Sequence, residues 1–310
     1  MRSCELAGWG SYLPERVVTF GKQTRYRIPD DVTQLDMLAA AAEQALERAG
    51  MQASELDCVI AACAAGIQPI PATAALVMER IAPDATAAAL DIGTTCTSFI
   101  TALDIASRYL ADGSYTRILI VSGDVGTRFL DESQRESFEL FSDAAAAVIL
   151  TPSADPERGV VASLQQTWPR HAHDTELRGG LSLHPAQAFP TGDPADYLFD
   201  MDGRRALMAM LTLLPGFFDR FYASSCIARD EFDLVIPHQA SAALGLAMRR
   251  LGIPKGRYVD EVADFGNMVS ASVPFMLVRC LDDGRLARGD LALLCGTAAG
   301  LTANALALRV

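Results

Sequence analysis

Long hydrophobic runs are missing from this sequence. None of its 310 residues lies in an uninterrupted apolar stretch of 18 or more, whereas a membrane-spanning helix needs about 20. The N-terminal segment Met1-Arg2-Ser3-Cys4-Glu5 also lacks the apolar core of a secretory signal and reads as the start of a strand. We therefore expect a protein that is neither exported nor membrane-spanning.

Paired cysteine spacings and metal-ligand motifs are also missing. The seven cysteines are an odd number without short paired spacings, which argues against a disulfide framework and a zinc site and predicts a reducing cytoplasm. His171 and His173 could share a metal ion, but their spacing fits no strong ligand motif. We therefore expect no metal.

Positive charge is scarce. The 26 lysines and arginines stand against 38 acidic residues, which gives a net charge of −12. Such a balance disfavours nucleic acid and anionic membranes as partners. An acidic carrier protein or coenzyme could then be held only by local basic residues, for which the candidates are Arg25, Arg27, Arg135, Arg204, Arg205, Arg249 and Arg250.

One cysteine stands between a short apolar run and a helix. Apolar residues recur at helical spacing from Phe99 to Leu110, and Asp112-Gly113 ends the pattern. Cys96 therefore lies at a helix N-terminus, where unpaired N–H groups and the helix dipole favour the nucleophilic thiolate. The alternative from this stretch alone is that Cys96 merely packs, as most free cysteines do.

The sequence repeats itself at an offset of 170 to 176 residues. Four segments recur in the same order, each after its counterpart. The pairs are Glu55-Leu56-Asp57 with Glu231-Phe232-Asp233, residues 76–81 with 246–251, Asp91-Ile92-Gly93 with Asp264-Phe265-Gly266, and residues 110–113 with 281–284.

Each half alternates strands with helices, including helices at about 34–49 and 203–224. Such alternation predicts sheets covered by helices, and hence two similar α/β halves around a pseudo-two-fold axis. The polar, proline-containing stretch after Thr151 breaks every periodicity. We place the boundary there, between residues 1–153 and 154–310.

Residues 164–202 depart from the repeat. They hold three of the four histidines, a Gly-Gly pair and several prolines. Long excursions of this kind often shape a substrate pocket.

The duplication brings three chemically useful residues together. The turn that carries Cys96 corresponds to the second-half turn that contains Asn267, and His238 follows a strand end. Equivalent positions converge at the axis, so a thiol, an imidazole and an amide can meet there, as thioester chemistry requires. Taken singly, His238 could be a structural residue and Asn267 a turn or helix cap.

These residues resemble the thiolase superfamily, and within it the β-ketoacyl-acyl-carrier-protein synthase III group. The resemblance covers almost the whole chain and is carried by the Cys96 turn, Gly123-Asp124, residues 141–145, Pro237-His238-Gln239-Ala240, Gly266-Asn267, residues 270–274 and residues 296–302. It implies a five-layered αβαβα thiolase-like fold. It also implies a homodimer with no cofactor beyond the thioester substrates.

The resemblance also implies a mechanism. Cys96 takes an acyl group from coenzyme A or acyl carrier protein, and a malonyl-type thioester then loses carbon dioxide and attacks it. His238 and Asn267 stabilise the enolate oxygen. The backbone N–H groups of Cys96 and Ala299 form a second oxyanion hole.

Several substrate-contacting positions follow from the same resemblance. Arg25 and Arg135 match nucleotide-contacting arginines, Phe141 lies in a matching motif, and Arg249 with Arg250 match a basic pair for the carrier protein. Ile70 matches a residue that reaches into the partner subunit's acyl pocket, and its size predicts an acyl group bulkier than acetyl.

The chain also departs from the family pattern. It lacks the family's adenine-stacking tryptophan and an arginine shortly after His238, where Ala242-Ala243-Leu244 stands. A carrier-bound donor is therefore as plausible as coenzyme A. The loop 164–202 differs in length as well, which favours a specialised lipid or polyketide pathway over housekeeping fatty-acid initiation.

Other functions remain compatible with these residues. The acyl group could pass to an oxygen or nitrogen nucleophile, although Asn267 argues against that, because simple acyl transfer has less need of an enolate donor. A thiolase would carry histidine at Asn267, so we interpret Cys295 as a strand-end packing residue. A non-catalytic partner subunit commonly loses the nucleophile, which this chain keeps.

Overall fold

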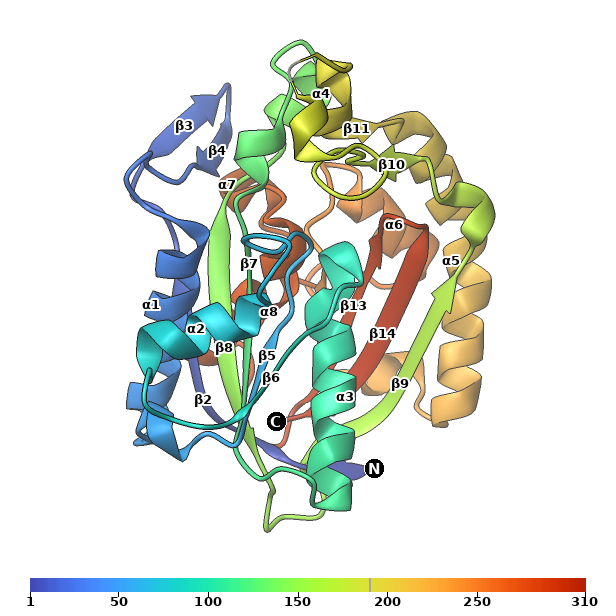
Figure 1. Ribbon diagram of the computed structural model, residues 1–310. Helices are drawn as coiled ribbons and strands as arrows, with labels where there is room; N and C mark the ends of the chain where they lie inside the picture. The colour runs from blue at the N-terminus through green and yellow to red at the C-terminus, as the bar shows by residue number, and fades with distance from the viewer. Residues whose placement is uncertain (190) are drawn as a thin grey trace.

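Two five-stranded sheets form the centre of the molecule (Figure 1). The computed structural model describes residues 1–189 and 191–310. The first sheet has the order β2-β8-β7-β5-β6, with bounds Glu5–Tyr12, Ala144–Thr151, Ile118–Asp124, Cys58–Ala61 and Ala88–Asp91. The second has the order β1-β9-β14-β13-β12, with bounds Arg2–Ser3, Gly159–Thr167, Thr302–Arg309, Leu291–Ala298 and Leu234–Pro237.

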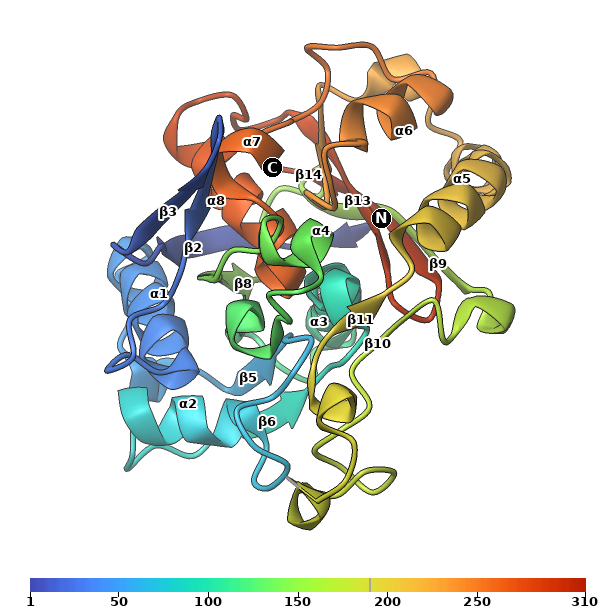
Figure 2. The same ribbon diagram turned by 90° about the horizontal axis from the view of Figure 1, so that it is seen from above.

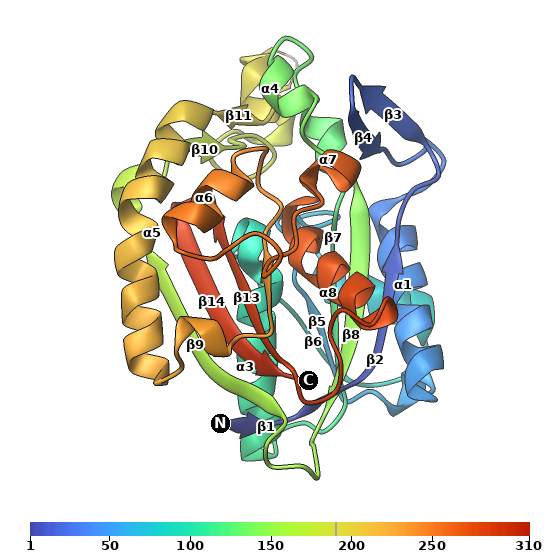
Figure 3. The same cartoon turned by 180° about the vertical axis from the view of Figure 1, so that it is seen from behind.

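Helices lie outside and between the sheets, which gives five layers. Helices α1 (Gln34–Ala49) and α2 (Thr73–Ile81) pack on the outer face of the first sheet. Helices α3 (Ser98–Asp112) and α8 (Ser272–Asp282) lie between the sheets and form the largest core. Helices α5 (Gly203–Ser225) and α6 (Leu244–Arg250) cover the second sheet, as Figure 3 shows from behind. The predicted thiolase-like architecture is confirmed.

The sheet orders repeat one topology, as the internal sequence repeat predicts. Strands β2, β8, β7 and β5 correspond in order to β9, β14, β13 and β12. In the first sheet, β6 pairs in parallel with β5. At the corresponding place in the second sheet, Tyr258 forms a parallel bridge to Val235 of β12. The expected division into 1–153 and 154–310 stays a prediction, and β1, which lies in the first of these ranges, pairs antiparallel with β9 in the second sheet.

Local sequence signals account for these elements. Strands β7 and most of β8 are buried along their length, as expected for apolar strands with helices on both faces. Helix α1 begins with a capping box between Thr33 and Asp36 and ends at Gly50, whose φ is 64°. It lies so close to β2 that a Cβ on Gly10 would stand 2.3 Å from the Ala41 carbonyl oxygen.

Smaller elements surround the upper end of the sheets. A hairpin of β3 (Val17–Phe20) and β4 (Gln23–Tyr26) lies near the short helices α4 (Arg135–Phe138) and α7 (Val262–Phe265). Within the excursion, β10 (Thr175–Glu176) pairs with β11 (Asp200–Met201), which passes above the start of α3 (Figure 2). Arg178 ties this excursion together through Glu176, Asp196 and Asp200. No helix among the described residues is long and apolar enough to cross a membrane.

Candidate active site

Cys96 lies in a strained turn between β6 and α3. The turn is a short 3₁₀ helix, Thr95–Thr97, and it leads directly into α3. Thr95 has a φ of 47°, a left-handed conformation that a β-branched residue rarely adopts. The Ser98 hydroxyl holds the turn by accepting from the Thr94 N–H at 2.9 Å. The predicted helix N-terminus is confirmed, and the turn presents the sulfur to a cavity.

The pKa of the Cys96 thiol depends on burial as well as on the helix N-terminus. Burial and the nearby Asp124 carboxylate raise the pKa of the Cys96 thiol to about 12. The N–H groups of Cys96 and Ala299 and the Thr95 hydroxyl lower that pKa, but by less than burial raises it. The backbone N–H groups do favour the thiolate, as the sequence predicts, but desolvation raises the pKa of Cys96 by more than they lower it.

His238 follows the last residue of β12. Its N–H donates to the Cys295 carbonyl oxygen of β13 at 2.8 Å. The side chain is buried, and burial lowers the pKa of His238 to about 4. Its Nδ1 accepts no hydrogen bond from the described residues. The imidazole is therefore neutral near pH 7 and carries one N–H that it can donate.

Gly296 sets the position of the His238 ring. A Cβ on Gly296 would lie 2.7 Å from His238 Cβ and 3.4 Å from Thr97 Cγ2. We expect Gly296→Ala to lower the free energy of unfolding by about 1–3 kcal/mol through overpacking and to slow any reaction that uses the imidazole, because the ring would be displaced. Thermal unfolding and product assays measure the two effects.

Gly93→Ala is the matched control for that substitution. A Cβ on Gly93 would meet no heavy atom within 4 Å, although this glycine lies only three residues before Cys96. A Gly296→Ala variant as stable and as active as Gly93→Ala would contradict the packing argument.

Asn267 is fixed by four hydrogen bonds. Its Nδ2 donates to the Ala240 carbonyl at 3.1 Å, and its Oδ1 accepts from the Val269 N–H at 2.9 Å. Its own N–H donates to the Leu140 carbonyl, and its carbonyl accepts from the Ser142 N–H, both at 2.9 Å. The amide is therefore oriented before any substrate binds.

The turn that carries Cys96 and the turn that follows Asn267 have the same local structure, but their residues align one position away from the pairing of Gly93 with Gly266 that the sequence suggested. Val269 has a φ of 52°, like Thr95, and the Met268 N–H donates to the Ser272 hydroxyl as Thr94 does to Ser98. The counterpart of Cys96 is therefore Ser270, and Asn267 lies three residues earlier.

Ser270 contacts a buried carboxylate beside the nucleophile. Its hydroxyl donates to Asp124 Oδ2 at 2.5 Å, and the N–H groups of Ala64 and Ala65 also donate to Asp124. Burial raises the pKa of Asp124, while these bonds lower it. Asp124 lines the same cavity as Cys96, so it contributes to the field at the sulfur.

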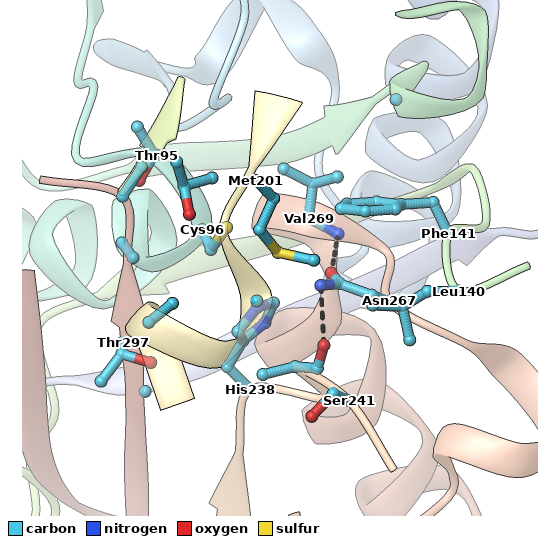
Figure 4. Close-up of a pocket in the computed structure, with 18 of the residues that line it drawn as sticks. Thr95, Cys96, Leu140, Phe141, Met201, His238, Ser241, Asn267, Val269 and Thr297 are labelled. Carbon is cyan, nitrogen blue, oxygen red and sulfur yellow. Dashed lines mark hydrogen bonds between the residues drawn. The ribbon is translucent and has the colours of Figure 1, made fainter. Parts of the chain in front are cut away.

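Figure 4 shows Cys96, His238 and Asn267 turned toward one cavity, although they come from distant segments. The cavity has a volume of about 760 Å³. Met201 of β11 projects between Cys96 and Asn267, and the sequence reasoning missed it. Only the interpretation of residues 164–202 as pocket-shaping pointed toward it.

Other predicted site residues lie at the same cavity. Phe141 lines the cavity, and its backbone forms a parallel bridge with Asn267. Its ring packs edge-on against that of Phe199, with 5.0 Å between the ring centroids. Ala299 lies in the loop after β13 and lines the cavity. Cys295 is buried in β13, where burial raises the pKa of its thiol to about 12.

Arg25 requires a correction. Its side chain is fully buried, and its guanidinium donates to the carbonyl oxygens of Glu139, Thr24, Val262 and Ala263. These bonds join β4 to α4 and α7 and leave none of the side chain accessible, although Arg25 borders the cavity that Cys96 lines. In this chain Arg25 is a structural residue.

The remaining predicted binding residues are exposed. Arg135 is 84% exposed and pairs with Glu139 at 2.5 Å. Arg249 and Arg250 lie at the end of α6 and line a small second pocket. Ile70 is 83% exposed and is not among the residues lining its own chain's cavity.

The histidines of the excursion contact different carboxylates. His171 Nδ1 lies 2.7 Å from Asp174 Oδ2, and His173 Nδ1 lies 2.9 Å from Glu176 Oε2. Across the described residues, no three metal-ligating side chains gather in one place. His171 and His173 are therefore each paired with a carboxylate of the same excursion.

The raised thiol pKa predicts a distinct pH dependence. Because the thiolate fraction grows about tenfold per pH unit below the pKa, alkylation of Cys96 by iodoacetamide should keep rising from pH 7 to pH 10. An ordinary cysteine would level off above pH of about 8.5. The rate is measured by intact-protein mass and peptide mapping.

Asp124→Asn tests the cause of that shift. Removing the negative charge lowers the pKa of Cys96, so the alkylation curve should move to lower pH. The amide oxygen can still accept from the Ala64 and Ala65 N–H groups, which preserves the loop. A wild-type plateau near pH 8, or an unshifted Asp124→Asn curve, would contradict this electrostatic account.

Comparison with known proteins identifies the family. Its profile, described as 3-oxoacyl-[acyl-carrier-protein (ACP)] synthase III, matches residues 90–168, and the profile of its C-terminal part matches residues 223–310. Over 323 aligned positions the chain is 30% identical to the β-ketoacyl-[acyl-carrier-protein] synthase III of Geobacillus kaustophilus, and 98% of each chain is covered.

Solved structures agree with that match. The 3-oxoacyl-[acyl-carrier-protein] synthase III of Aquifex aeolicus has a TM-score of 0.87 and 27% identity, over 99% of this chain and 100% of the other. The priming β-ketosynthase of the R1128 polyketide biosynthetic pathway has a TM-score of 0.87 and 25% identity, over 99% and 96%. This chain therefore belongs to the β-ketoacyl-[acyl-carrier-protein] synthase III family of condensing enzymes.

Proposed function

We propose that this protein joins an acyl group, carried on Cys96, to a malonyl-type thioester by decarboxylative Claisen condensation. The observation that carries the proposal is the meeting of one thiol, one neutral imidazole and one fixed amide in a single cavity. The family match supports the same reaction, because the names of the relatives specify β-ketoacyl synthesis.

Acylation of Cys96 is the first half-reaction. The sulfur attacks the carbonyl of an acyl thioester, the bond to the donor sulfur breaks, and the donor leaves as a thiol with the proton from Cys96. His238 is neutral, so one ring nitrogen is unprotonated and can accept that proton. The N–H groups of Cys96 and Ala299, which lower the pKa of the thiol, can also stabilise the developing oxyanion.

Condensation is the second half-reaction. The bond from Cα to the carboxylate breaks, carbon dioxide leaves, and the electron pair becomes an enolate whose oxygen accepts from His238 and from Asn267 Nδ2. The enolate carbon then attacks the acyl carbon and expels the Cys96 sulfur, which takes up one proton. No redox step occurs, so we propose no cofactor beyond the two thioesters.

The partners follow from charge and exposure. Arg135, Arg249 and Arg250 are exposed cations on a chain of net charge −12, which suits an acidic carrier protein or the phosphates of coenzyme A. We also propose a homodimer in which the exposed Ile70 enters the partner's acyl pocket. The pathway is proposed to be a specialised lipid or polyketide pathway.

Intact-protein mass spectrometry tests the proposal. The protein is incubated first with acyl-CoA or acyl-carrier-protein donors of several chain lengths and then with malonyl-carrier protein. We expect one acyl adduct on Cys96 and its conversion to a β-ketoacyl product with release of carbon dioxide. Failure of every donor to acylate the protein would favour a non-catalytic subunit, and acylation without condensation would favour plain acyl transfer.

A further inference from the structure

The cavity does not end at the reacting residues but continues between α5 and α6. Its α5 wall is a stripe of apolar side chains at helical spacing: Leu207, Met210, Leu214 and Phe218. Leu214 and Phe218 keep 7% and 4% of their surface accessible, whereas Phe217 and Phe221 on the sheet-facing side of the same helix have none. Leu214 and Phe218 also belong to the core that covers the second sheet, so the stripe borders both that core and the cavity.

The opposite wall comes from α6 and the residue that follows it. Leu244, Ala247, Met248 and Leu251 line the cavity, and each remains 4–5% accessible. We call the space between these two stripes the α5/α6 channel. Figure 3 shows the two helices side by side over the second sheet.

The chemistry of the walls selects a hydrocarbon. Every side chain that α5 and α6 contribute to the α5/α6 channel is aliphatic, aromatic or a thioether, and helical backbone groups are already paired. The amides of a pantetheine arm would lose their water there without gaining partners. Ala242 and Ala243 line the same cavity, so small apolar residues stand where the family resemblance led us to expect an arginine.

The strand residues at the base of the α5/α6 channel indicate which of the two substrates binds there. Pro237 and Cys295 are register partners in β12 and β13, and both line the cavity directly beside His238. The backbone donors at Cys96 and Ala299, which suit the acyl carbonyl, come from other elements. A chain lying in the channel therefore passes His238, where the enolate oxygen of the second thioester binds under the proposed function.

We infer that the second substrate is a malonyl-type thioester with an alkyl chain on Cα, and that this chain occupies the α5/α6 channel. The inference rests on the proposed function and names its substrate class. Decarboxylation breaks the bond from Cα to the carboxylate, and the same electron pair forms the bond to the acyl carbon. Carbon dioxide leaves, Cys96 regains one proton, and the product is a β-ketoacyl thioester branched at Cα.

Competition between extender units tests the inference. Cys96 is first acylated, with loading verified by mass, and the enzyme then receives malonyl and hexylmalonyl thioesters of one carrier. We expect wild type to favour the hexyl compound in kcat/KM, since each buried methylene adds up to about fourfold in binding. Ala247→Phe and Leu214→Phe fill the channel from opposite walls, and each should reduce the hexyl-to-malonyl ratio at least tenfold.

Met208→Phe is the matched control, because Met208 lies on the exposed face of α5 at 58% accessibility. It should leave the ratio unchanged. A wild-type preference for unsubstituted malonyl, or ratios unmoved by both channel variants, would overturn the inference. So would an Ala247→Phe variant that changed only the chain length accepted on Cys96. Failure to condense even unsubstituted malonyl would instead contradict the proposed function.

Discussion

Cys96→Ala is expected to abolish condensation, with a loss of at least about 10⁴-fold, as for removal of nucleophiles in other covalent enzymes. The alanine variant cannot form an acyl-enzyme, so intact mass should show no adduct with any donor. Cys96 lies in a turn strained at Thr95, and its side chain points into a cavity, so shortening it removes little core packing. The variant should therefore remain folded.

Two other cysteines make this experiment specific. Among the described residues that line the cavity, Cys96 and Cys295 are the two cysteines. Peptide mapping of the wild-type adduct should therefore distinguish Cys96 from Cys295. Cys226→Ala is the control, because Cys226 is exposed and is not a cavity-lining residue. An acyl adduct on Cys295, or a loaded Cys96→Ala variant, would contradict the assignment of the nucleophile.

The fold was largely predictable because the sequence contains an internal repeat. The helices expected at about 34–49 and 203–224 are α1 and α5, which differ from the expectation by one residue at most. Repetition at a nearly constant offset locates elements without knowledge of their contacts. The pairing of β1 with the second sheet was not predictable, because two residues carry no periodicity.

The site was predictable in its residue types but not in its electrostatics. A motif identifies Cys96, but the pKa of its thiol depends on the surrounding atoms. Burial raises that pKa by more than the backbone N–H groups of the turn lower it. Arg25 matched a family position, yet four carbonyl oxygens surround its guanidinium. Met201 reaches the site through a long excursion, and residue spacing cannot predict how such a segment folds back.

Asn267→Ala should separate the two half-reactions. The backbone of Asn267 is held by Leu140 and Ser142, so truncation should remove the amide and leave the main chain in place. Loss of one preorganised oxyanion donor typically costs about 10²–10³ in rate. We expect that loss in carbon dioxide release from malonyl-carrier protein and in β-ketoacyl formation. Acylation of Cys96 should change less than about threefold, because its oxyanion uses other donors.

Ser241→Ala is a suitable comparison, because Ser241 lines the same cavity but carries no part of the proposed chemistry. Rates of the two half-reactions are measured separately, by mass for acylation and by released carbon dioxide for decarboxylation. If Asn267→Ala slowed both equally, the amide would serve positioning and not the enolate. If it slowed neither, acyl transfer to an oxygen or nitrogen nucleophile would become the better assignment, because only an enolate requires this donor.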